Sequence, residues 1–244
     1  MRMRRKGRLI VLAMLAFLPL AISRRLYRWF FGYRIGRRVR LGIVLLDCQS
    51  LSIGEGTSLG HGTFFWRCGK VSIGEEARIG PLNLFRGGES IFLGNYVTIL
   101  RLNVVNAIPD HDLTNDPASV FELGDGSVLT AEHRIDFTDR VSIGSRTILG
   151  GRNSSLWTHN RRTGAPVRIG DSCYLGSEIR IAPGVVVPDR CIVGLGAVIT
   201  GVLSTPETLY GGVPAHAIRP LTTDDLAFLN DKTRSDLPPE WTRC

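Results

Sequence analysis

The chain has 244 residues, a net charge of +8 and 43% hydrophobic residues, but only 8% aromatic residues. This length and composition suit one folded domain with a sizeable core, and they exclude a disordered or collagen-like chain. A protein with several membrane-spanning helices is also excluded, because no apolar run reaches about 18 residues without a charge.

The positive charge lies at the N-terminus. Residues 1–40 hold twelve of the 30 Lys and Arg and no Asp or Glu, whereas the rest of the chain holds 18 basic and 22 acidic residues, a net charge of −4. A nucleic-acid partner is therefore not expected, because the high isoelectric point belongs to the N-terminal segment alone. The five Cys are odd in number and form no Cys-x-x-Cys pair, which favours a reducing compartment over a disulfide framework.

The N-terminal segment combines these basic residues with an uncharged apolar run, residues 9–22, which is shorter than the roughly 20 residues that cross a bilayer. We expect residues 1–40 to form a helical arm at the membrane interface, with Arg side chains on anionic lipid. The aromatic side chains expected at headgroup depth are Tyr27, Trp29, Phe30, Phe31 and Tyr33. The alternatives are a signal peptide, although no small-x-small cleavage site precedes Arg24, and packing in the core or in an oligomer. Arginines on both sides of the run predict a cytoplasmic body, peripheral on the inner face of the cell membrane.

The body of the chain carries a repeat. From Ile169 to Ile199 every sixth residue is Ile, Leu or Val, and the same phase appears upstream as an aliphatic residue followed by Gly. These aliphatic heads are residues 53, 73, 93, 123, 143 and 169. A period of six predicts a coil with three flat sides and about 18 residues per turn, whose aliphatic side chains point inward and whose strands pair in parallel. The small residue after each head is expected to allow a tight corner, often at positive φ.

Several spacings between heads exceed one turn, so the coil must carry insertions. The largest excesses place these near residues 103–119 and 157–166. Loops that project from a rigid body often carry function. After the coil, Thr222 begins a helix N-cap signature with Asp224 and Asp225 in the first turn, so a short helix to about residue 230 is expected, followed by an extended end.

The segment 167–200, followed by Tyr210-Gly-Gly-Val-Pro-Ala-His-Ala-Ile-Arg219, resembles the tail of the hexapeptide-repeat acyltransferases. The likeness covers about residues 50–220. It is strongest to sugar O-acetyltransferases of surface-polysaccharide biosynthesis, because Thr158-His159 opens a loop that closes at 166–170 and His133-Arg134-Ile135-Asp136 precedes it by one coil. The resemblance implies an all-β fold, a left-handed parallel β-helix over 41–221, between the arm (1–40) and a C-terminal helix and tail (222–244).

Acetyl transfer from a thioester to a hydroxyl needs a base, and a neutral imidazole suits that role. His159 is the first candidate, because it lies in an insertion and matches the family motif. His133 is the second candidate, for substrate binding or joint action, with a hydrogen-bonded corner residue as the alternative. Asp136 is expected to orient an imidazole, with Asp139 as its rival. We expect His111 to be solvent-exposed.

The resemblance also implies acetyl-CoA as the donor, bound in a groove between neighbouring prisms of a homotrimer. The positions that match its binding residues are Ser177, Leu195, Gly196, Thr200, His216 and Arg219. Two positions depart from the family, since Leu195 often corresponds to Ala and Gly201 to Lys. The chemistry requires no metal, and a zinc site is disfavoured because no two His lie five residues apart.

These observations predict an O-acetyltransferase that acts on a small-molecule or lipid-linked sugar in surface-polysaccharide or glycolipid assembly. Two alternatives stay open. The same prism could N-acetylate an amino sugar or amino acid, and the sequence does not separate the two acceptors. It could also be a non-enzymatic scaffold that the arm holds at a membrane.

Overall fold

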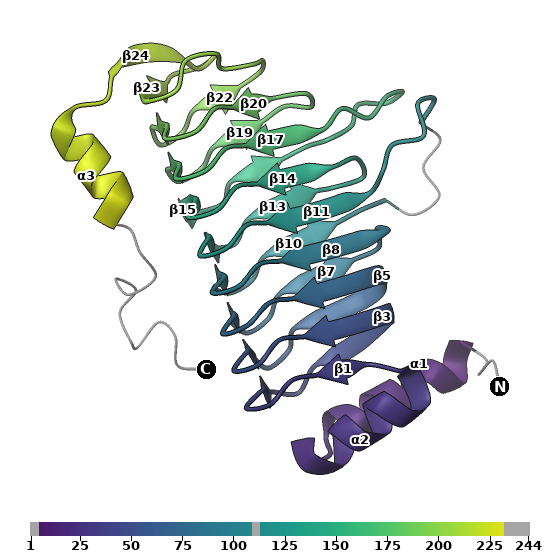
Figure 1. Ribbon diagram of the computed structural model, residues 1–244. Helices are drawn as coiled ribbons and strands as arrows, with labels where there is room; N and C mark the ends of the chain where they lie inside the picture. Colours follow the sequence, from purple (N-terminus) through teal and green to yellow (C-terminus); the bar gives the residue numbers. More distant parts are fainter. Residues whose placement is uncertain (1–4, 109–112, 232–244) are drawn as a thin grey trace.

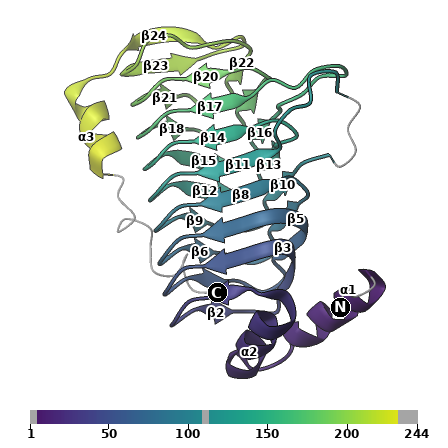
Figure 2. The ribbon, with the colours of Figure 1, turned by 45° about the vertical axis from the view of Figure 1, so that its right-hand side comes forward.

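The structure, a computed structural model, describes residues 5–108 and 113–231. It is a column of stacked turns, with α1 (Arg5–Ala16) and α2 (Leu20–Phe31) at the N-terminal end (Figure 1). Helix α3 (Thr223–Asp231) runs back beside the C-terminal turns, as a second view also shows (Figure 2). The described part of the chain therefore consists of one β domain with helices at its two ends.

The strands form three faces of a parallel β-helix. The first face holds β1 (Arg34–Ile35), β8 (Ser90–Leu93), β11 (Val120–Leu123), β14 (Val141–Ile143), β17 (Val167–Ile169) and β20 (Val186–Val187). The second face holds β7 (Leu84–Arg86), β10 (Val104–Asn106), β13 (Arg134–Asp136), β16 (Ser155–Leu156), β19 (Arg180–Ile181) and β22 (Val198–Ile199). The long strands β3 (Leu45–Ile53) and β5 (Phe64–Ile73) bend from the second face into the first.

The third face begins at β2 (Arg40–Leu41) and ends with an antiparallel pair, β23 (Thr208–Gly211) and β24 (His216–Pro220). Between them lie β4 (Ser58–Leu59), β6 (Arg78–Ile79), β9 (Thr98–Ile99), β12 (Val128–Ala131), β15 (Ile148–Arg152), β18 (Tyr174–Leu175) and β21 (Ile192–Val193).

The predicted repeat is confirmed residue by residue. The aliphatic heads Ile53, Ile73, Leu93, Leu123, Ile143 and Ile169 are direct partners in successive turns. All six side chains are at most 3% exposed, and together they form the centre of the core. Each such burial stabilises the fold by about 1.5–3 kcal/mol, so the stack is the main cohesive element of the β-helix.

The glycine after each head has a different role from the one predicted. Gly74 does not adopt positive φ, which instead occurs two residues later, at Glu76 (φ 50°). A Cβ on Gly74 would lie 2.6 Å from the backbone nitrogen of Asn95 in the next turn. Glycine is therefore needed here because successive turns approach closely, rather than for its backbone freedom.

A column of buried polar side chains follows the corner between the third and second faces. Its members are Thr63, Asn83, Asn103, His133 and Ser154, all at most 1% exposed. In each member a side-chain atom accepts a hydrogen bond from the backbone N–H one turn further along the chain, at 2.9–3.3 Å. This corner column satisfies N–H groups that the short strands leave unpaired inside the prism.

Both predicted insertions occur at the corner between the second and first faces. They follow β10 and β16, and both project from the same side of the column (Figure 1). The first begins later than predicted, because residues 104–106 form β10 and the Val105 side chain is fully buried. His111 lies outside the described residues.

The N-terminal helices cap the first turns of the prism. The Tyr27 and Tyr33 side chains are 1% exposed, and the Tyr33 hydroxyl lies 2.9 Å from the carbonyl oxygen of Leu46 and 2.7 Å from that of Cys48. The prediction that both tyrosines lie at headgroup depth is therefore wrong, because the open end of the prism needs an apolar cover. Pro19, which has no backbone N–H, stands between α1 and α2 and divides the apolar run.

The start of the β-helix differs from the predicted boundary, and the start of the last helix agrees with it. Strands β1 and β2 pair with β3 and β4, so the β-helix begins before residue 41. At the other end, the Thr222 side chain accepts a hydrogen bond from the Asp225 N–H, which confirms the predicted cap of α3. Residues 232–244, expected to be extended, lie outside the described part. None of the described helices is long and apolar enough to cross a membrane.

Candidate functional site

His159 and Asp136 meet at the base of the second insertion. The His159 Nδ1 atom lies 2.8 Å from Asp136 Oδ2. Asp136 ends β13, and His159 follows β16, the neighbouring strand on the second face. The two side chains are 23 residues apart in sequence, and the pairing of parallel strands brings them together. The carboxylate that contacts this imidazole is therefore that of Asp136, not that of Asp139.

The Asp136 carboxylate is buried and surrounded by donors. Oδ2 also accepts hydrogen bonds from the backbone N–H of Thr158 at 3.0 Å and from its hydroxyl at 2.7 Å. Oδ1 accepts the hydroxyl of Thr138 at 2.7 Å. Several hydrogen bonds to one carboxylate fix its orientation. Its Oδ2 atom is an acceptor, so it favours the tautomer of His159 with hydrogen on Nδ1, which leaves the lone pair on Nε2.

The Nε2 atom is the part of His159 that can act on a ligand. No side chain or backbone group of residues 5–108 and 113–231 makes a hydrogen bond with it. The side chain is 19% exposed, so the imidazole is held by the protein but reached by solvent. An imidazole with one nitrogen fixed and the other available has the geometry of a general base.

The loop that carries His159 is closed on itself and held by the first insertion. An antiparallel bridge joins His159 to Gly164, and the Asn160 side chain caps the N–H groups of Arg162 and Thr163. Asn115, from the first insertion, forms two reciprocal hydrogen bonds with the backbone of Gly164, at 2.8 and 2.9 Å. The two insertions therefore form one unit beside the imidazole.

Asp139 and His133 make no hydrogen bond with His159. Asp139 is next to the Thr158 hydroxyl, which accepts its backbone N–H at 2.9 Å, and its own Oδ1 accepts the N–H of Arg140. His133 belongs to the corner column at the opposite end of β13. Its Nδ1 accepts the Ser154 N–H at 3.2 Å, and Nε2 lies 3.2 Å from the Leu149 carbonyl oxygen. Burial lowers its pKa from 6.5 to about 4, so His133 is neutral near pH 7.

The residues predicted to bind the donor lie on the C-terminal side of His159. Ser177 and Gly196 stack in successive turns, where the Gly196 N–H donates to the Ser177 carbonyl oxygen at 2.9 Å, and the Leu195 side chain beside them is 76% exposed. They occupy the corner between the third and second faces. Thr200 is exposed at the other end of the second face, on the same edge as His159.

His216 and Arg219 lie on β24, at the C-terminal end of the column, and both are exposed. The Arg219 guanidinium forms an ion pair with Asp225 of α3, at 2.5 Å. This pairing raises the pKa of Arg219 and lowers that of Asp225. The structure thus brings Asp136 to His159, while the six predicted donor residues lie on the turns beyond, at two corners and on the last strand.

Sequence reasoning missed several residues around the imidazole. Thr138 and Asn115 were not candidates, although Asn115 lies in an insertion that was expected to carry function. Trp157 directly precedes Thr158 and is 49% exposed, and an exposed Trp beside a candidate base is a signal that could have been used.

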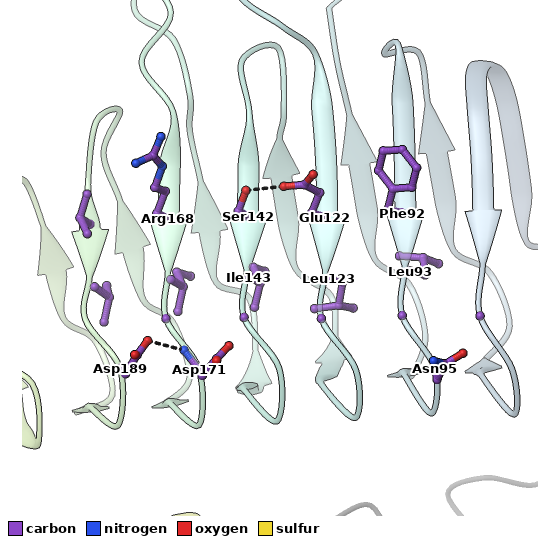
Figure 3. Close-up of a pocket in the computed structure, with 18 of the residues that line it drawn as sticks. Phe92, Leu93, Asn95, Glu122, Leu123, Ser142, Ile143, Arg168, Asp171 and Asp189 are labelled. Carbon is purple, nitrogen blue, oxygen red and sulfur yellow. Dashed lines mark hydrogen bonds between the residues drawn. The ribbon is translucent and has the colours of Figure 1, made fainter.

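A shallow groove of about 760 Å³ lies elsewhere, on the first face and its corner with the third (Figure 3). Two of its polar side chains bind one another, Ser142 Oγ donating to Glu122 Oε2 at 2.7 Å. Neither His159 nor Asp136 lines this groove, so it is separate from the candidate site. Within the described residues no three His, Cys, Asp or Glu side chains are grouped to hold a metal ion.

Comparison with known proteins gives two curated relatives and many similar folds. The chain is 23% identical over 160 residues to galactoside O-acetyltransferase of Escherichia coli and 30% identical over 95 residues to a putative acetyltransferase of Schizosaccharomyces pombe. These matches cover 64% and 39% of this chain, and they span only 66% and 37% of the relatives' own length. No protein-family profile matches the chain.

Among solved structures, UDP-N-acetylglucosamine acyltransferase from Campylobacter jejuni has a similar fold, with a TM-score of 0.57 and 15% identity. The match covers 81% of this chain and 77% of that one, and it supports the fold alone. In its stacked six-residue repeat and in the acetyltransferase names of its two relatives, the chain is similar to the hexapeptide-repeat acyltransferases.

Proposed function

We propose that the protein is an acetyl-CoA-dependent O-acetyltransferase that acts on a sugar hydroxyl, with His159 as general base. The observation that carries this proposal is the contact between His159 Nδ1 and the buried Asp136 carboxylate, which leaves Nε2 available. The names of the two curated relatives support acetyl transfer, and one of them names a galactoside as the acceptor.

In the proposed reaction, Nε2 of His159 takes the proton of the acceptor hydroxyl as its oxygen attacks the thioester carbonyl carbon. The C–S bond then breaks, and the imidazolium returns the proton to the departing sulfur of CoA. Asp136 stabilises the imidazolium through Nδ1. No covalent enzyme intermediate and no metal ion enter these steps.

The donor side of the site follows from the turns after His159. We place the pantetheine arm along Ser177, Leu195, Gly196 and Thr200, and the CoA phosphates near His216 and Arg219. In the described chain Arg219 is paired with Asp225, so its binding of a phosphate requires that this exposed ion pair opens. Exposed pairs contribute little stability, so this opening costs little. A homotrimer, with the site between prisms, is part of the same proposal.

We further propose that α1 and α2 hold the enzyme on an anionic membrane surface. The exposed side chains of these helices and of their connection include large apolar ones, each 40–78% exposed: Ile10, Met14, Phe17, Leu18, Ile22, Trp29 and Phe30. Arg25 and Arg28 are exposed on the same helix as Trp29. An apolar surface flanked by cations is the composition that binds the interface of anionic lipid.

The transfer proposal is tested with purified protein, acetyl-CoA and a panel of galactosides, nucleotide sugars and lipid-linked sugars, with release of free CoA as the measurement. Acetylated sugar and CoA should appear in equal amounts. If no sugar or amine is acetylated and calorimetry shows no binding of CoA, the scaffold alternative replaces the enzymatic one. If only amino sugars react, at nitrogen, the enzyme is an N-acetyltransferase.

The membrane proposal is tested separately by co-sedimentation with vesicles of phosphatidylglycerol or phosphatidylcholine. The double variant Phe17→Ser, Trp29→Ser should lose binding to the anionic vesicles, while Val202→Ser, which alters an equally exposed apolar residue at the other end of the column, should retain it. Equal binding by all three proteins would overturn the proposal that these apolar side chains hold the protein on the membrane.

A further inference from the structure

A row of outward-facing residues leads along the second face to the site from its N-terminal side. Trp66, Arg86, Asn106 and Asp136 are direct partners on β5, β7, β10 and β13. In this register Trp157, after β16, occupies the next position. Asp136 and His159 therefore divide the row into a part that faces the arm and a part that faces the proposed donor residues.

The part of the row on the arm side carries an aromatic, a cationic and an amide side chain, which are groups that can bind a sugar. The Trp66 side chain is 41% exposed, and the Arg86 side chain is exposed as well. Arg86 has no acidic partner among the described residues, unlike Arg8, Arg140 and Arg219. Asn106, which is half-buried, lies between Arg86 and Asp136 and offers both a donor and an acceptor.

From this juxtaposition we infer that the row Trp66–Arg86–Asn106 is the acceptor subsite, and that the acceptor is a glycan with an anionic group, a phosphate or a carboxylate. Arg86 binds the anion, Asn106 binds a hydroxyl of the sugar at the site, and the Trp66 ring covers the apolar face of the next sugar. This inference rests on the proposed function, because it assigns the acceptor side of the same site.

The spacing of the strands sets the distance between the two groups of such an acceptor. Neighbouring strands lie about 4.8 Å apart, so the Arg86 backbone is roughly 10 Å from that of Asp136, and Trp66 is one strand further. If the Arg86 side chain extends towards the site, its guanidinium lies closer to Asp136 than its backbone does. The anion should therefore be on the acetylated sugar itself or on its direct neighbour in the glycan.

The direction of the row agrees with the position of the arm. Beyond Trp66 the same edge reaches Asp47 of β3, whose carboxylate binds the Arg8 guanidinium of α1 at 2.9 Å. The row thus runs from His159 to the helix that we place on the membrane. A phosphate that links a sugar to a lipid would enter from that end, whereas a carboxylate within the glycan would need no lipid.

The test compares three acceptors that share one ring: methyl galactoside, galactose 1-phosphate and galacturonic acid. We expect wild-type protein to have the lowest KM for one or both of the anionic sugars. The variant Arg86→Gln should raise that KM at least tenfold, with kcat changed less than threefold and the KM of methyl galactoside unchanged, since a charge-assisted hydrogen bond is lost only from the anionic acceptors. Arg86→Lys should recover part of the loss.

Arg134→Gln is the matched control, because Arg134 is exposed on the same face but stands in the other outward position of β13. It should change each KM less than twofold. An equal effect of both variants would show general attraction by positive charge and overturn the subsite, as would a wild-type preference for the neutral sugar. If Arg86→Gln raises the KM of galactose 1-phosphate, the anion is a phosphate. If it raises the KM of galacturonic acid, the anion is a carboxylate.

Direct binding separates this inference from the proposed function. Ligand-observed NMR with galactose 1-phosphate and with galacturonic acid needs no turnover. If at least one of them binds to wild-type and His159→Asn protein and the Arg86→Gln variant does not bind it, the subsite stands even if no acetyl group is transferred. If acetyl transfer proceeds but neither anionic sugar binds through Arg86, the subsite fails and the proposed function stands.

Discussion

The two ends of β13 place a histidine in two different settings. At one end His133 is fully buried in the corner column, and both of its ring nitrogens face protein groups. At the other end Asp136 holds only one nitrogen of His159, and solvent reaches the ring. Both residues stand in polar surroundings, so polarity alone does not distinguish them. What does distinguish them is whether the second nitrogen is already used.

This difference shows how a solenoid produces a site. Inside the prism the polar side chains of the corner column bond to neighbouring protein groups, as Asn83 and Asn103 do by accepting a backbone N–H of the next turn. An insertion frees a strand end from that constraint, because the chain leaves the prism there. The imidazole that follows β16 can therefore be held from one side and remain open on the other.

The largest effect should come from His159→Asn. This variant removes the proposed base but keeps a polar side chain of similar size, so acetyl transfer to a sugar should fall about 10²–10⁴-fold in kcat. Thermal unfolding should be nearly unchanged, because the ring makes a single hydrogen bond with the described part of the protein. Steady-state release of CoA measures the rate. A variant with wild-type kcat would remove His159 from the mechanism.

The second effect concerns the carboxylate. Asp136→Asn presents an amide where four donors now converge, so the imidazole loses the partner that sets its tautomer, and kcat should fall about 10²–10³-fold. Asp139→Asn is the control, because Asp139 lies close by without contacting His159. A larger loss in the control than in Asp136→Asn would mean that the other carboxylate orients the base.

The third prediction tests the corner column by its stability. His133→Ala removes the acceptor of the Ser154 N–H and should lower the free energy of unfolding by about 1–3 kcal/mol. His133→Asn should cost less, because Asn83 and Asn103 already show that an amide oxygen fits this column. Both variants should retain acetyl transfer while folded. A 10²-fold loss of kcat in folded His133→Asn would instead support joint action with His159.

His133 should also make the stability depend on pH. Its pKa is about 4 in the folded protein and 6.5 when the side chain is fully solvated, so below pH 6.5 the unfolded chain binds a proton that the native state does not. This contribution to stability is complete above pH 6.5 and is lost as the pH falls towards 4, by about 3 kcal/mol. Urea unfolding at several pH values should show this loss in wild-type protein, and His133→Asn should lack it.

The sequence predicts the prism well and the site in part. Aliphatic residues at a period of six fit a three-sided coil. The positions of the heads from Ile53 to Ile169 therefore predict the turns, the faces and the places of the insertions. The roles of single polar residues depend on contacts across turns of unequal length. Spacing along the sequence therefore leaves both Asp136 and Asp139 as candidate partners of His159. The pairing of β13 with β16 brings Asp136 to the imidazole.

The arm shows the same limit. Its aromatic residues form one cluster in sequence, but the end of the prism takes Tyr27 and Tyr33 into the core and leaves Trp29 and Phe30 outside. Helical periodicity alone does not tell which side faces the protein and which faces a membrane. That depends on where the first turn of the β-helix is open, which is a property of the assembled structure.

The smallest effect should come from the contact between the two insertions. Asn115→Ala removes both hydrogen bonds to Gly164, the residue that bridges to His159, so the loop gains freedom without losing any group of the site. Looser positioning of the base should lower kcat about three- to tenfold, with little change in the KM for acetyl-CoA. Asn95→Ala is the matched control, because the Asn95 side chain also accepts a backbone N–H, that of Glu75, but on a corner away from the site. If both variants lose activity equally, the loss reflects the stability of the column. If only Asn115→Ala loses it, the first insertion is a positioning element for the imidazole, and the two loops act as one part of the site.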